Sequence, residues 1–152
     1  MQHTFWIAKN RLAGRPGPNL MPWDLRELLR SGFKAILSVN DGELCHSDEI
    51  AALGMVHAVI PLSANAPPQD GDREVCIANL PKALAFIKAQ SEVGAVLVHC
   101  RSGKDRTGLV MAYYFLKEHG VSPIEAMERV LSIRPIAFSA AGWREFSQSI
   151  LE

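Results

Sequence analysis

An apolar run, a polar loop with two glycines and a second apolar run follow one another around residue 100, and this order constrains the fold strongly. Residues 95–98 have the length and β-branched content of a buried strand. Residues 109–116 begin a helical pattern. The loop between them, residues 99–108 (HCRSGKDRTG), therefore leads from a strand into a helix N-terminus. Because the N–H groups of a first helical turn lack partners within the helix, such a loop binds anions.

A cysteine and an arginine lie six positions apart in this loop, and both suit phosphoryl transfer. The field of the helix N-terminus, with Arg106 across the loop, favours the thiolate of Cys100 and makes it a nucleophile. The planar guanidinium of Arg106 matches the equatorial oxygens of a transferring phosphoryl group, a geometry that lysine cannot reproduce. We expect the Thr107 hydroxyl to donate to the Cys100 sulfur and to stabilise it as a leaving group.

The other residues of the loop are candidates for substrate binding. Gly103, next to Ser102, suits a tight curve and a close approach of the backbone to a ligand. Lys104 either contacts a second phosphate or is a solvated residue on the rim. Arg101 is expected to turn its backbone to the phosphate and its side chain to water or an acidic neighbour. The two extra cations favour highly anionic substrates.

The segment from Cys100 to Arg106 resembles the C-x5-R signature of the cysteine-based protein tyrosine and dual-specificity phosphatases. The resemblance covers nearly the whole chain, and it implies a phosphocysteine intermediate, no metal or other cofactor, and an aspartate general acid on a loop after Ile-Pro. Further landmarks stand in the order typical of small dual-specificity phosphatases: Phe5-Trp6-Ile7, Arg11-Leu12-Ala13-Gly14, Ile36-Leu37-Ser38-Val39, Ile60-Pro61 and Arg134-Pro135.

The general acid is missing from the place where this family usually carries it. After Ile60-Pro61 the chain reads LSANAPP, residues 62–68, and the next carboxylates are Asp70 and Asp72. Three solutions are open. Asp70 or Asp72 reaches in on a longer loop, Asp105 inside the phosphate-binding loop transfers the proton, or a good leaving group needs little help.

Asp105 is the general acid that we favour. Residues 104–107, KDRT, are similar to the loops of phosphoinositide phosphatases and of some bacterial phosphatases with mixed lipid and protein specificity, which place an acid inside the loop. The alternative is structural, a pair of Asp105 with Arg106 or with a neighbouring N–H group. The same resemblance implies a phosphorylated protein as substrate, with a phosphoinositide or inositol phosphate as the alternative.

Length and charge limit the classes of function. The chain has 152 residues, enough for one phosphatase domain over residues 1–152 with a single core. Sixteen basic and sixteen acidic residues cancel, which gives no support for nucleic-acid binding or general adhesion to acidic membranes. No apolar stretch approaches the roughly 20 residues that span a bilayer, and the N-terminus lacks the pattern of a signal peptide. The composition leaves the oligomeric state open.

The cysteine usage favours a reducing compartment, and we expect the protein in the cytoplasm. Cys45, Cys76 and Cys100 are an odd number without metal-ligand spacing, which argues against both a disulfide framework and a zinc site. Cys45 or Cys76 could trap an oxidised Cys100 as a disulfide, because low-pKa thiolates oxidise readily in this family. The alternative, which we favour, is that both are small core residues.

Strand and helix patterns alternate along the chain, which predicts an α/β fold with a mostly parallel central sheet flanked by helices on both faces. In such a sheet ligands bind beyond the carboxyl ends of the strands, where Cys100 is placed. His99 is expected to hydrogen-bond beneath the loop and support the thiolate. Ser47 is expected to cap a short helix. The predicted strands cover residues 5–8, 11–13, 35–39, 55–60 and 95–98, and helices are expected over 23–30, 47–54, 74–90, from 109, from 122 and over 140–151.

Two classes of function remain. The first is a phosphomonoester hydrolase of the protein tyrosine or dual-specificity type. The second is a catalytically weak module that uses the same loop to recognise phosphorylated partners, for which the missing acid is the only support. A rhodanese-like sulfur carrier also uses a cysteine loop at a helix start, but it needs no Arg106-Thr107 pair and is disfavoured.

Overall fold

The five strands form one sheet in the order β1-β2-β5-β3-β4. The computed structural model describes residues 3–152. β2, β5, β3 and β4 run parallel, and β1 is antiparallel to β2 at one edge. The prediction of a mostly parallel sheet is confirmed. The strands are β1 (Phe5–Ala8), β2 (Leu12–Pro16), β3 (Phe33–Ser38), β4 (Val56–Val59) and β5 (Ala95–Cys100).

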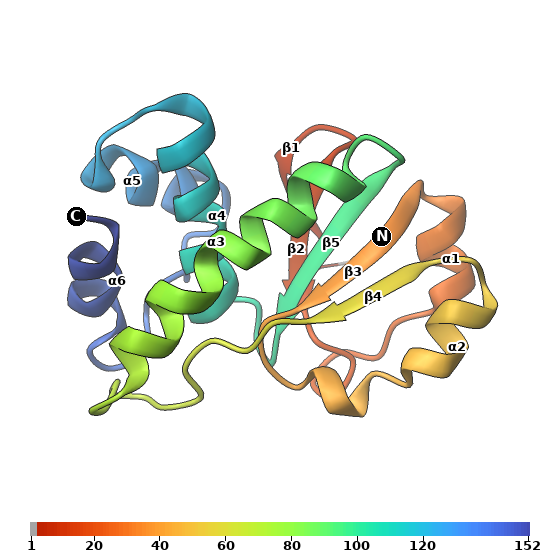
Figure 1. The fold of residues 1–152 in the computed structure, drawn as a ribbon, viewed down its shortest axis with the longest axis horizontal. Coiled ribbons are helices and arrows are strands. Elements are labelled where there is room, and N and C mark those ends of the chain that lie inside the picture. The colour runs from red at the N-terminus through yellow and green to blue at the C-terminus, as the bar shows by residue number, and fades with distance from the viewer. Residues whose placement is uncertain (1–2) are drawn as a thin grey trace.

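Helices cover both faces of the sheet, as predicted. One face carries α1 (Leu25–Arg30) and α2 (Ser47–Ala52), which is preceded by a short 3-10 turn, η1 (Gly42–Leu44). The other face carries the remaining four helices, which Figure 1 shows gathered away from α1 and α2. These are α3 (Asp72–Gln90), α4 (Asp105–His119), α5 (Pro123–Ile133) and α6 (Trp143–Leu151).

Every residue of β5 is buried, because this central strand is covered on both sides. Successive side chains of a strand point to opposite faces. Val96, Val98 and Cys100 accordingly belong to the core beneath α3 to α6, and Leu97 belongs to the core beneath α1 and α2. His99 follows the same alternation and lies against the Trp23 ring on the α1 side, with ring centroids 5.1 Å apart. At the end of β5 the side chains of Cys100 and His99 thus lie on opposite faces of the sheet.

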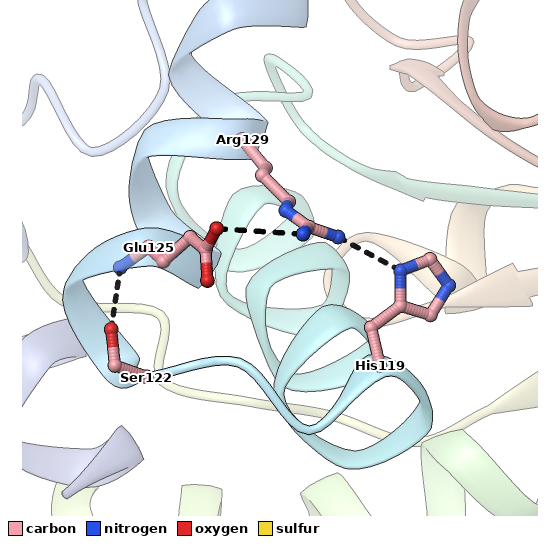
Figure 2. A network of polar contacts seen from close by, with 4 residues as sticks. All are labelled: His119, Ser122, Glu125 and Arg129. Atoms are coloured by element: carbon pink, nitrogen blue, oxygen red, sulfur yellow. Dashed lines mark hydrogen bonds and ion pairs between the residues drawn. The ribbon is translucent and has the colours of Figure 1, made fainter.

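The connection from α4 to α5 shows how the helical layer is assembled (Figure 2). The Ser122 hydroxyl caps α5 by accepting from the Glu125 N–H at 3.1 Å. Arg129 reaches the Glu125 carboxylate at 3.5 Å and the His119 ring at 2.9 Å. Because exposed ion pairs of this kind contribute little free energy, the buried side chain of Val130 and its neighbours in α5 hold the two helices together.

Helix boundaries differ from the prediction where a side chain has another partner. α1 begins at Leu25, because the Asp24 carboxylate caps it by accepting from two N–H groups of the first turn. Ser47 is the first residue of α2 and not its cap, and its hydroxyl bonds to a histidine of β4 instead. α6 begins at Trp143 and not near residue 140.

α3 begins two residues earlier than predicted and runs without a break through Pro81. Proline cannot bond the carbonyl four residues before it. That carbonyl belongs to Ile77, which is 49% exposed, so water can take the place of the missing N–H group. Within residues 3–152 no helix is long and apolar enough to cross a membrane.

Candidate active site

The C-x5-R loop, residues 100–106, joins the carboxyl end of β5 to the N-terminus of α4. Cys100 is completely buried at the end of the strand. The Thr107 Oγ1 hydroxyl donates to Cys100 Sγ at 3.1 Å, which is the contact expected from the sequence. Because α4 begins at Asp105, the N–H groups of its first turn have no partner within the helix. The Cys100 sulfur and a helix N-terminus are thus combined in one loop.

Two residues outside the loop orient its backbone. The Gly17 N–H donates to the Arg101 carbonyl at 3.0 Å. The Arg134 guanidinium donates to the carbonyls of Ser102 at 2.9 Å and Gly103 at 3.1 Å. In a planar trans peptide the N–H group points opposite to the carbonyl. The three N–H groups that follow these carbonyls therefore point away from Gly17 and Arg134 and are left for a ligand.

Two glycines allow the end of β2 to lie against this loop. A Cβ atom at Gly17 would overlap the Cys100 carbonyl oxygen and lie 2.8 Å from His99 Nδ1. Gly103 has a φ of +67°, and a Cβ there would lie 2.7 Å from the Arg15 backbone. Only glycine adopts that φ without cost and leaves room for the neighbouring backbone. The expectation of a tight curve at Gly103 is confirmed.

Arg106 is held from two sides and is only 8% exposed. Its Nε donates to the Ser63 carbonyl oxygen. Its guanidinium carbon lies 5.4 Å from the centre of the Trp143 ring, whose Nε1 donates to the Asn65 carbonyl at 2.9 Å. Ser63 and Asn65 were not predicted to contact Arg106 or its loop, because they come from a distant part of the chain.

Asp105 is buried and tied to the connection between α5 and α6. Its Oδ1 accepts from the Ala140 N–H at 3.2 Å. The acid inside the loop therefore has an N–H partner, although that N–H comes from a distant segment and not from a neighbouring residue. Arg101 lies exposed on the rim, and Lys104 is half-buried at the start of α4.

The two aspartates before α3 have different surroundings. Asp72 is 8% exposed and accepts from Asn65 Nδ2 at 3.0 Å and from the Gln69 N–H at 2.6 Å. Burial raises the pKa of Asp72, but hydrogen bonds from Gln69, Asn65 and Ser63, together with the charge of Arg106, outweigh it and lower the pKa overall. Asp70 is exposed in the preceding turn. Asp72 is thus an ionised carboxylate whose hydrogen bonds hold the loop that precedes α3.

His99 lies beneath the loop, as the sequence predicted. Its Nδ1 is 2.9 Å from the Cys100 carbonyl oxygen. Burial, more than any other influence, lowers the pKa of His99 to about 4. The imidazole is therefore neutral at pH 7. Because a carbonyl only accepts, the proton of the ring lies on Nδ1.

The other two cysteines are buried free thiols. Burial raises the pKa of both Cys45 and Cys76. Cys45 Sγ lies 3.3 Å from His99 Nε2, and Cys76 belongs to the same core cluster as Cys100. Across residues 3–152, no three His, Cys, Asp or Glu side chains come together as metal ligands would.

A family model described as "PTP-SAK: Swiss Army Knife protein, DSP-PTPase phosphatase domain" matches residues 1–141. The chain belongs to this DSP-PTPase family. The family resemblance drawn from the loop and its landmarks is thereby confirmed.

Curated relatives match this DSP-PTPase chain over shorter segments. Dual specificity protein phosphatase 1 of Arabidopsis thaliana is 39% identical over 56 residues, 37% of this chain and 28% of that protein. Phosphatidylglycerophosphatase and protein-tyrosine phosphatase 1 of Rattus norvegicus is 39% identical over 59 residues, 38% of this chain and 31% of that protein. The chain thus spans less than a third of the length of these two relatives.

Solved structures match the DSP-PTPase fold over nearly the whole chain. Human DUSP28 has a TM-score of 0.74 at 21% identity, covering 99% of this chain and 94% of that one. Tk-PTP in its active form has a TM-score of 0.75 at 25% identity, covering 98% and 96%. PTPMT1 in complex with PI(5)P has a TM-score of 0.71 at 22% identity, covering 98% and 97%.

Proposed function

We propose that this DSP-PTPase chain is a phosphomonoester hydrolase that acts through a phosphocysteine intermediate. The observation that carries the proposal is the 3.1 Å contact from Thr107 Oγ1 to Cys100 Sγ at the N-terminus of α4. A hydroxyl donor on sulfur is of use where the sulfur carries negative charge. Arg106, one residue before Thr107, supplies the two Nη nitrogens that would grip the phosphoryl oxygens.

In the first step Cys100 Sγ attacks phosphorus. The S–P bond forms while the ester P–O bond breaks, and Arg106 and the oriented N–H groups of the loop hold the three remaining oxygens. The leaving oxygen takes a proton from the general acid. Asp105 is the proposed acid, because its carboxyl accepts one hydrogen bond, from the Ala140 N–H, whereas the Asp72 carboxylate accepts from both Asn65 and Gln69 and has a lowered pKa.

In the second step water attacks the phosphocysteine. The water proton passes to the Asp105 carboxylate, the O–P bond forms and the S–P bond breaks, so that inorganic phosphate and a thiolate are released. The Thr107 hydroxyl stabilises the departing thiolate through its hydrogen bond to Cys100 Sγ. Both steps balance without a metal or an external reductant.

The decisive test of this function replaces the nucleophile. Cys100→Ser is expected to lower phosphate release from a phosphotyrosine peptide and from a phosphoinositide by about a thousandfold or more, because serine lacks the thiolate. Cys76→Ala, which removes another buried thiol, is the matched control and should keep most activity. Full turnover in Cys100→Ser would contradict the cysteine mechanism. Binding of both compounds without turnover by the wild type would favour the phosphate-recognition module instead.

The general acid is tested by substitutions that keep side-chain size. Asp105→Asn should remove one limb of the pH–rate profile and lower the turnover of an alkyl phosphate by about a hundredfold or more. The loss should be much smaller for a nitrophenyl phosphate, whose leaving group needs no proton. Asp70→Asn and Asp72→Asn should retain the limb, and its loss in either of them would show that the acid comes from the loop before α3.

The proposed substrate is a phosphorylated protein of the kind that tyrosine and dual-specificity phosphatases hydrolyse. A phosphoinositide is the second candidate, because Lys104 and Arg101 place two cations at the rim of the loop. One relative is named a phosphatidylglycerophosphatase, and one structural neighbour is a complex with PI(5)P. A wild-type preference for the peptide or for the lipid in the assay above decides between the two.

The cytoplasm is the compartment that we propose, because all three cysteines are free thiols, as is usual for proteins of a reducing compartment. We further propose that residues 1–152 act as one phosphatase domain. The proposed mechanism uses neither nucleic acid nor a cofactor.

A further inference from the structure

A chain of polar side chains leads away from Cys100 on the face of the sheet opposite to its thiol. His99 Nε2 lies 2.6 Å from the Ser38 hydroxyl, which lies 2.8 Å from His57 Nε2. His57 Nδ1 lies 2.6 Å from the hydroxyl of Ser47. The four residues come from β5, β3, β4 and α2, so that the chain crosses three adjacent strands and ends at an exposed helix start.

Two carbonyls, those of Cys100 and Asp41, determine the direction of the hydrogen bonds in this chain. Since the Cys100 carbonyl only accepts, His99 Nδ1 donates to it and His99 Nε2 is an acceptor. Ser38 must then donate to His99 and accept from His57 Nε2–H. His57 Nδ1 is left as an acceptor for the Ser47 hydroxyl. Each N–H and O–H group of the four side chains then has an acceptor. The reverse direction would place the His99 Nδ1 lone pair against the carbonyl oxygen of Cys100.

Burial makes this arrangement costly to disturb. His99 and Ser38 have no exposed surface, and His57 is half-buried. An unpaired polar atom at such a place costs the full desolvation of the group. The other groups that face His99 are the Cys45 thiol, the Trp23 ring and the charges of Asp41 and Arg15. Cys45 has its own acceptor, the Asp41 carbonyl at 3.4 Å, so Ser38 is the oxygen donor to His99 Nε2.

We propose that Ser38 and His57 are positioning residues for the Cys100 nucleophile: they hold His99 in the tautomer whose Nδ1–H neutralises the Cys100 carbonyl. That carbonyl is the negative dipole end nearest to the sulfur along the chain, and a donor on it lowers the electrostatic cost of a thiolate. The inference rests on the proposed role of Cys100 as a thiolate nucleophile. It concerns residues of the α1 side, which never touch the substrate.

The test measures the thiolate without relying on phosphatase turnover. Alkylation of Cys100 by iodoacetamide is followed against pH in wild type and variants, in a Cys45→Ala Cys76→Ala background, and the midpoint of the profile is recorded. Ser38→Ala is expected to raise the midpoint by about one pH unit while the plateau rate at high pH is unchanged. His57→Leu should shift it in the same direction by a smaller amount, because Ser38 keeps its hydroxyl but loses the donor that orients it.

Two matched controls separate positioning from packing. His57→Gln restores an N–H group near the position of Nε2 and should return the midpoint to that of wild type. Ser47→Ala removes the exposed last member of the chain, where water can donate in its place, and should leave the midpoint unchanged. The acidic limb of kcat/KM should move with the alkylation midpoint while KM stays constant.

The failures of the two proposals give different results. An unchanged midpoint in both Ser38→Ala and His57→Leu, with a low midpoint in wild type, overturns the positioning role and leaves the cysteine mechanism standing. An equal shift in His57→Gln and His57→Leu also overturns it, because packing alone then accounts for the change. A wild-type Cys100 that reacts like an ordinary exposed thiol overturns the proposed function and the inference with it.

Discussion

His99 illustrates, at the scale of single residues, how burial prepares a group for its role. The ring has no exposed surface, and its two nitrogens lie within hydrogen-bond distance of the Ser38 hydroxyl and the Cys100 carbonyl. Its pKa of about 4 follows mainly from the loss of water around the charged form. The same residue in the unfolded chain titrates near 6.5. The folded and unfolded states therefore bind different numbers of protons between these two values.

Acid should weaken the folded protein in this window. Because the pKa of His99 is lower in the folded state, the unfolded state binds the proton first as the pH falls. The contribution of His99 to the free energy of unfolding is therefore complete above pH 6.5 and falls by about 3 kcal/mol in total between pH 6.5 and pH 4. Urea unfolding at pH 7, 5.5 and 4.5 measures this loss. His99→Asn, whose amide can still donate to the Cys100 carbonyl, has no group that titrates there and should show a flatter profile. An equally steep profile in the variant would mean that other groups cause the loss.

The loop between β4 and α3, residues 60–71, shows how a connection without regular structure is held in place at the scale of elements. The Asp72 carboxylate at the start of α3 accepts from Asn65 and Gln69 of the loop. The Asn65 carbonyl accepts from Trp143 of α6, and the Ser63 carbonyl accepts from Arg106 of α4. Hydrogen bonds thus link this loop to three helices, α3, α4 and α6.

Asp72→Asn should weaken the hydrogen bonds that hold this loop to the start of α3. An amide keeps one acceptor oxygen but loses the charge, so the free energy of unfolding at pH 7 should fall by about 1–3 kcal/mol. Because the folded-state pKa of Asp72 lies below its ordinary value of 3.8, this stabilisation is complete well above pH 3.8 and is lost as the pH falls through the folded-state pKa. Chemical unfolding of both proteins at pH 7 and pH 3 checks this. A deficit of the same size at pH 3 would assign it to packing and not to charge.

At the scale of the whole molecule, the parallel sheet brings the ends of β2, β5 and β3 to one edge. The register pairs Pro16 with Cys100 and Ser38 with His99, so that three segments from different parts of the chain meet at the C-x5-R loop (Figure 1). Two separate cores lie on the two sides of the sheet. The thiol of Cys100 lies in one of them, and the chain through His99 and Ser38 lies beside the other.

The parts of the site that are contiguous in the chain were predictable. Apolar periodicity predicted a strand over 95–98 and a helix from 109, and the structure extends the strand to Cys100 and begins the helix at Asp105. The contact of Thr107 with Cys100 was also predicted. Arg134 was visible in the sequence only as a family landmark. Its contact with the loop carbonyls depends on where α5 ends in space, for which periodicity carries no signal.

The sequence by itself determined the class of fold, the family and the position of the C-x5-R loop, because each depends on local spacing and residue type. Only the tertiary structure decided which side chains surround that loop. Hydrogen bonds such as those from Arg106 to Ser63 and from Ser38 to His99 join residues that are 43 and 61 positions apart. Which partners meet at those separations is determined by strand order and helix packing, and these depend on the whole chain and not on any one segment.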